Sequence, residues 1–143
     1  AWTAAGGAPG PADVELADTG HAQAEAAARH LSSAGVTRLW SSDLARARQT
    51  AGYLADRLAL PVDEDPRLRE FDVGERQGLT LAEFAQRFPE EYAAWQRGDG
   101  LVPVKGGELS DDVEARMVPA LQDCLAGLDR AQTGLVVTHG AAM

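Results

Sequence analysis

The sequence has a single cysteine, few cations, and no apolar run of the roughly 20 residues that a membrane helix needs. One cysteine, Cys124, excludes an internal disulfide framework and a zinc site built on cysteines. The 13 lysines and arginines are outnumbered by 22 acidic residues, and the net charge of −9 argues against nucleic acid as the main partner. No basic, apolar signal peptide opens the chain. We therefore expect a cytoplasmic protein that binds neither nucleic acid nor membranes.

The 143 residues, of which 45% are hydrophobic, predict a single globular domain over residues 1–143. Apolar periodicity predicts helices over residues 20–33 and 108–128 and two short helices, broken at Pro89, within residues 79–104. A further helix, capped by Ser42 or Asp43, is expected to run to residue 58. Strands are expected over residues 36–41, 60–62 and 134–138, the last as a buried central strand. This alternation predicts an α/β fold whose mostly parallel sheet is covered by helices on both faces.

Apolar side chains indicate how two of these segments are expected to pack. Four aromatic residues recur at near-helical spacing between residues 79 and 104: Phe84, Phe88, Tyr92 and Trp95. They either pack this excursion onto the core or line a substrate lid. The long helix is expected to bury Val113, Met117, Leu121, Leu125 and Leu128. Cys124 lies among these leucines and is expected to be a small buried side chain rather than a reactive thiol.

Two of the expected strands end in polar residues, Ser41-Ser42 and Thr138-His139. Parallel sheets bind ligands beyond the carboxyl ends of their strands, so these ends are candidate sites. Arg46 follows in the first turn of a helix, where backbone N–H groups and a guanidinium favour an anion. Gly140 and the small Ala141 leave room beside His139.

The order of these residues along the chain carries a resemblance to a known family. Five blocks occur: DVELADTGHAQA (13–24), SSDLARARQTA (41–51), LREFDVGERQG (68–78), GGELS (106–110) and VVTHG (136–140). In this order they resemble the histidine phosphatase superfamily, also called the phosphoglycerate mutase-like family. Two positions depart from its pattern: Ala17 stands where threonine is usual, and Leu109 stands where serine is usual.

The resemblance implies a role for each matching residue. Arg46 and His139 would bind the phosphoryl oxygens, and Glu70 would protonate the leaving alkoxide. Thr3 and the backbone around Gly140 and Ala141 would add phosphate-binding donors. In the family, a histidine attacks phosphorus and the phosphohistidine is then hydrolysed by water. This chemistry needs fixed donors and a placed acid, but no metal and no cofactor.

The motif that carries the nucleophile in this family, Arg-His-Gly, does not occur in the sequence. Trp2 and Thr3 resemble the residues that closely follow that motif. The family also continues beyond the VVTHG block with a helix and at least one more strand. We therefore expect the fold to be incomplete at both ends, with the nucleophilic histidine outside these 143 residues.

The leading hypothesis is a metal-independent phosphomonoesterase that hydrolyses a small-molecule phosphate monoester. A phosphoglycerate mutase is the alternative enzyme, although the short stretch from Glu70 to Gly106 favours the phosphatase branch. A catalytically inactive, phosphate-binding domain is the alternative from another class. A dinucleotide-binding module fits poorly, because the glycines at residues 6–10 follow no expected strand. The oligomeric state, including a homodimer, stays open.

Overall fold

The computed structural model describes residues 12–99 and 103–143. The described chain forms two compact units, one made of Asp13–Arg69 with Arg116–Met143 and the other containing Glu70–Ala115. Each unit is described by itself below. The expectation of a single domain stays a prediction.

A parallel sheet of three strands in the order β2-β1-β3 lies at the centre of the first unit. The strands are β1 (Val36–Ser41), β2 (Val62–Glu64) and β3 (Thr133–Val137). Leu39 pairs with Val62 on one side and with Leu135 on the other. The parallel sheet and the place of β1 confirm the expectation, whereas β2 begins two residues later than expected. The chain leaves α2 through the left-handed residue Ala59 and pairs with β1 only from Val62 on.

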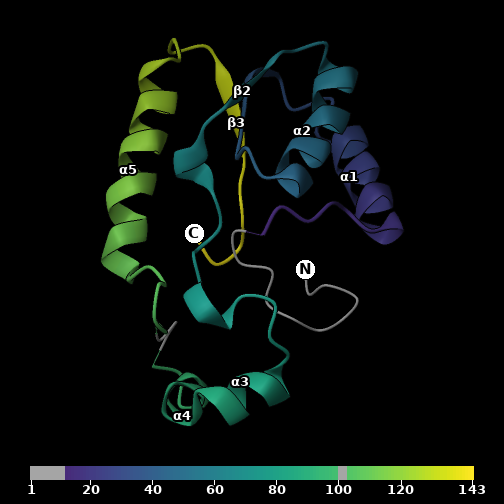
Figure 1. Cartoon of the computed structure of the whole chain (residues 1–143). Helices are drawn as coiled ribbons and strands as arrows, with labels where there is room; N and C mark the ends of the chain where they lie inside the picture. The colour runs from purple at the N-terminus through teal and green to yellow at the C-terminus, as the bar shows by residue number, and fades with distance from the viewer. Residues whose placement is uncertain (1–11, 100–102) are drawn as a thin grey trace. The chain divides into compact units, whose positions relative to one another are not determined.

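Helices lie on both sides of these strands, as Figure 1 shows. α1 (Asp18–Leu31) packs on α2 (Ala45–Leu58), and Leu39 of the sheet contacts this pair in a cluster with Ala28 and Leu54. The opposite side carries the Trp40 ring, which lies over Gly134 of β3. A Cβ at Gly134 would lie 2.6 Å from Trp40 Cζ3, so a glycine is needed there. The prediction of helices on both faces is thereby confirmed.

Among the described strands β3 pairs with β1 alone, and its residues are mostly half-buried. Its apolar, β-branched sequence indicates a strand that packs against other elements, and the expectation that it is a central strand stays a prediction.

The long helix α5 (Ser110–Ala126) buries Val113 and Met117 as expected but not the leucines that were expected beside them. Val113, Met117, Ala120 and Cys124 are buried, whereas Leu121 and Leu125 are 37% and 69% exposed. At about 100° per residue, Ala120 and Cys124 lie within about 20° of Val113 around the helix axis. Leu121 and Leu125 are rotated by about 80° and 120°, so the stripe that begins at Val113 leaves them outside. The expected burial of Cys124 is confirmed.

The second unit contains α3 (Leu81–Arg87) and α4 (Pro89–Gln96), and the break between them falls at Pro89 as expected. A capping box at Thr80 and Glu83 starts α3. The aromatic residues of this excursion pack on one another, with ring centroids 5.6 Å apart for Phe84 and Tyr92.

One residue of the short helix η2 (Gly74–Arg76) joins the aromatic cluster of the second unit. The buried Arg76 guanidinium lies 4.1 Å from the Phe84 ring and 5.6 Å from the Trp95 ring.

Among the helices in the described ranges, none is long and apolar enough to cross a membrane.

Candidate functional site

The helix that carries Arg46 is capped from a distant part of the sequence. Its N-cap residue is Leu44, which has no capping side chain. The carboxylate of Asp13 accepts a hydrogen bond from the Ala45 N–H at 2.5 Å. A cap by Ser42 or Asp43 was therefore the wrong prediction, because the Asp43 carboxylate is held by Arg69 instead. Nothing in the local sequence reveals a capping residue 32 positions away.

A second hydrogen bond fixes the segment of Asp13 alongside this helix. The Leu16 N–H donates to Gln49 Oε1 at 2.7 Å. Asp13 and Leu16 thus contact the first turn of α2 and the next turn. The segment holds the start of α2 in place, with Arg46 half-buried in its first turn.

The polar ends of two neighbouring strands, which the sequence marks as candidate sites, meet at one edge of the sheet. β1 and β3 are adjacent and parallel, so Ser42 and His139, which follow them closely, lie at the same edge of the sheet. His139 Nε2 lies 2.8 Å from Ser42 Oγ. Both side chains are buried, with 7% of His139 and none of Ser42 exposed. The sequence places Ser42 at a strand end, but no sequence pattern identifies it as a partner of His139.

The surroundings of His139 favour its neutral form. Burial, followed by the positive charges of Arg46 and Arg116, lowers the pKa of His139 to about 4. The Asp43 carboxylate acts in the opposite direction without reversing the shift. A neutral imidazole therefore lies within the electrostatic influence of two guanidinium groups, which is the kind of environment that attracts an anion.

Side chains of the first unit hold the segment that leads to Glu70. Arg69 binds the Asp43 carboxylate through two hydrogen bonds, Nε to Oδ1 at 2.7 Å and Nη2 to Oδ2 at 2.5 Å. Asp43 in turn follows Ser42 directly. Thr138 Oγ1 donates to the Leu68 carbonyl at 2.9 Å. The residues next to Ser42 and His139 thus bind the residues just before Glu70.

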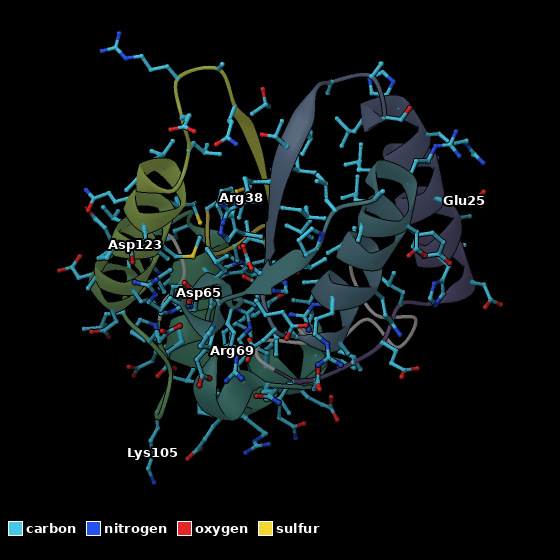
Figure 2. The ribbon with its side chains drawn as sticks, turned by 90° about the horizontal axis from the view of Figure 1, so that it is seen from above. Glu25, Arg38, Asp65, Arg69, Lys105 and Asp123 are labelled. Carbon is cyan, nitrogen blue, oxygen red and sulfur yellow. The ribbon has the colours of Figure 1, made fainter. Side chains whose placement is uncertain are left out.

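Two further contacts of this segment come from α5. Arg116 donates from Nη1 to the carbonyls of Arg67 and Arg69, both at 2.8 Å. The Arg67 guanidinium binds the carboxylates of Asp65 and Asp123, which are labelled in Figure 2. The role of Arg116 could not be read from the sequence, because a carbonyl acceptor leaves no pattern in the side-chain sequence.

The remaining predicted residues are placed as follows. Glu70 begins the second unit, is half-buried, and accepts a hydrogen bond from the Phe71 N–H through Oε1 at 2.9 Å. Gly140 and Ala141 follow His139 and are exposed, and a Cβ at Gly140 would meet no atom within 4 Å. Thr3 lies outside the described residues. The roles of these residues stay predictions.

In residues 12–99 and 103–143, no group of three or more His, Cys, Asp and Glu residues could hold a metal ion. His21 and His30 lie on α1. His21 is half-buried with Nδ1 at 3.1 Å from Tyr53 Oη, and His30 is exposed.

Comparisons with known proteins agree with the blocks found in the sequence. The family model described as "Histidine phosphatase superfamily (branch 1)" matches residues 1–143. The chain is 38% identical to the glucosyl-3-phosphoglycerate phosphatase of Mycolicibacterium vanbaalenii, over 92% of the chain and 60% of that protein. It is 36% identical to the "Probable phosphoglycerate mutase GpmB" of Proteus mirabilis, over 99% of the chain and 66% of that protein. The chain thus spans about two thirds or less of these relatives.

A solved structure supports the same relationship. A mycobacterial glucosyl-3-phosphoglycerate phosphatase in complex with inorganic phosphate superposes with a TM-score of 0.85 and 37% identity. The match covers 94% of this chain and 68% of that one.

Proposed function

This chain belongs to the histidine phosphatase superfamily, and we propose that it forms part of a metal-independent phosphomonoesterase that acts on a small-molecule phosphate monoester. The phosphoglycerate mutase-like fold and the two phosphatase relatives support this proposal. The observation that carries it is the buried contact between Ser42 and His139 at the sheet edge, with the charge of Arg46 acting on His139.

In the proposed site, Arg46 and His139 bind the phosphoryl oxygens. The guanidinium offers two parallel donors, and the imidazole offers one. Backbone N–H groups around Gly140 and Ala141, together with Thr3, would complete the set of donors. Fixed donors of this kind stabilise the charge that spreads over the transferring oxygens, and they need no reorganisation when the reaction occurs.

Two catalytic groups complete the proposed reaction. Glu70 donates a proton to the leaving alkoxide, and a histidine attacks phosphorus to give a phosphohistidine that water hydrolyses. None of His21, His30 and His139 has an arginine before it and a glycine after it. We therefore assign the nucleophile to a segment of the protein outside these 143 residues.

A mutase is the second candidate, since one relative is named as a phosphoglycerate mutase. The short stretch between Glu70 and Gly106 favours the phosphatase. Hydrolysis of an aryl phosphate and isomerisation of 3-phosphoglycerate by the full-length protein separate the two activities. Isomerisation with negligible hydrolysis would exclude the phosphatase, and the absence of both would favour a phosphate-binding domain.

Replacing Arg46 with alanine tests the phosphate site. We expect a loss in kcat/KM that corresponds to about 3 to 4 kcal/mol, the scale of one lost oxyanion donor. Arg48→Ala is the matched control, because Arg48 lies two residues further along the same helix, is exposed, and pairs with Glu64 at 4.0 Å. Near-normal turnover in Arg46→Ala, or an equal loss in both variants, would refute the assignment.

A further inference from the structure

The hydrogen bonds around Ser42 point to a role that the proposed reaction leaves unassigned. We propose that Ser42 is a positioning residue that selects the Nδ1–H tautomer of His139, so that the ring presents an N–H donor to the phosphoryl group. The contact carrying this proposal joins Ser42 Oγ and His139 Nε2, at 2.8 Å between two buried side chains.

The direction of the hydrogen bond follows from the backbone. The Leu44 N–H donates to Ser42 Oγ at 3.3 Å, and a peptide N–H can only be a donor. Ser42 Oγ is therefore already an acceptor, and its single proton is left for another partner. In the part of the chain that the structure describes, the other hydrogen-bond partner of Ser42 Oγ is His139 Nε2.

The state of His139 makes that nitrogen an acceptor. A neutral imidazole has one protonated and one bare nitrogen, and the environment of His139 favours the neutral ring. When Ser42 donates to Nε2, the proton of the ring must lie on Nδ1. In the opposite tautomer, Nε2–H and the Leu44 N–H would both donate to Ser42 Oγ. The buried hydroxyl proton of Ser42 would then have no acceptor among the described residues.

The selected tautomer suits an anionic ligand. Nε2 is occupied by Ser42, so Nδ1 is the ring nitrogen that remains for a ligand. An Nδ1–H group donates to a phosphoryl oxygen, whereas a bare Nδ1 would direct a lone pair at it. The donation to a phosphoryl oxygen rests on the proposed function, whereas the assignment of the Nδ1–H tautomer rests on the hydrogen bonds of Ser42 alone.

The test is nitrogen NMR of the ligand-free, full-length protein with 15N-labelled histidine. A His139→Gln spectrum assigns the His139 signals. We expect the chemical shift of a bare nitrogen at Nε2 and that of a protonated nitrogen at Nδ1. A protonated Nε2 with a bare Nδ1 would overturn the proposal, and this result needs no Ser42 variant that folds.

Ser42→Ala then tests the cause. We expect His139 to lose its single tautomer and the affinity for inorganic phosphate to fall by about 10- to 100-fold, taking the scale from groups that orient a metal-binding imidazole. Ser41→Ala is the matched control, because Ser41 is equally buried and donates to the Ser42 carbonyl at 2.8 Å rather than to His139. It should keep the Nδ1–H tautomer.

The outcomes separate this inference from the proposed function. Retention of the Nδ1–H tautomer in Ser42→Ala would overturn the role of Ser42, whatever the protein binds. The expected tautomer in a full-length protein that does not bind inorganic phosphate would instead contradict the phosphate site, while the role of Ser42 in selecting the tautomer would stand.

Discussion

The hydrogen bond from the Ala45 N–H to Asp13 leads to a quantitative prediction for Asp13→Ala. The bond is 2.5 Å long and caps the helix that carries Arg46. Loss of a side-chain cap costs about 1 kcal/mol, within a range of about 0.5 to 2 kcal/mol. A carboxylate near a helix N-terminus adds about 0.3 to 1 kcal/mol at low salt. Because Asp13 is exposed, we take about 0.3 kcal/mol for the charge and about 1 kcal/mol for the cap. We therefore expect Asp13→Ala to lower the free energy of unfolding by about 1.3 kcal/mol.

Urea unfolding of the wild-type protein, Asp13→Ala and Asp13→Asn at low and high salt measures this loss. The asparagine keeps an acceptor oxygen but has no charge, so it should lose only about 0.3 kcal/mol, and high salt should remove that difference from wild type. A loss below about 0.3 kcal/mol in Asp13→Ala would refute the capping role. Equal losses in both variants, unaffected by salt, would refute the division into a hydrogen bond and a charge.

Three further predictions concern the acid, the imidazole and the buried arginine. Glu70→Gln should slow hydrolysis of alkyl phosphates far more than that of aryl phosphates with good leaving groups, and equal losses in kcat would mean that Glu70 is not the acid. The free energy of unfolding should fall as the pH is lowered from about 6.5 to about 4, because the unfolded chain binds a proton at His139 that the folded chain does not. His139→Gln should lessen this fall in urea titrations, and an unchanged pH dependence would contradict the assignment. Burial lowers the pKa of Arg76, and its described side-chain contacts are the Phe84 and Trp95 rings. The free energy of unfolding of Arg76→Met should therefore lie within about 1 kcal/mol of the wild-type value, because methionine keeps the packing without the buried charge. Arg76→Ala should lower the free energy of unfolding by about 2 kcal/mol or more, because it leaves a cavity. An equal loss in the two variants would show that the charge itself stabilises the fold.

Local patterns in the sequence were sufficient to predict most of the fold. The strand Val36–Ser41 was predicted with its observed bounds, and Pro89 divides the two short helices because its ring cannot continue α3. Parallel sheets bind ligands beyond the carboxyl ends of their strands, which is why the polar strand ends at Ser42 and His139 could be named as candidate sites. The bounds of single helices and strands were predictable because the deciding interactions lie within a few residues.

The errors arose where distant residues decide the structure. Asp13 caps α2 from 32 positions away, and Arg69 engages the Asp43 carboxylate that could otherwise have served as the cap. On α5, periodicity offered two neighbouring stripes, and tertiary packing selected the one with the small Ala120 and Cys124 rather than the leucines.

The most direct test of the central claim is a crystal structure of the full-length protein with inorganic phosphate bound. We predict that phosphate oxygens accept hydrogen bonds from the Arg46 guanidinium and from His139 Nδ1, with Ser42 Oγ still at Nε2. A phosphate bound elsewhere, with neither Arg46 nor His139 in contact with it, would contradict the account.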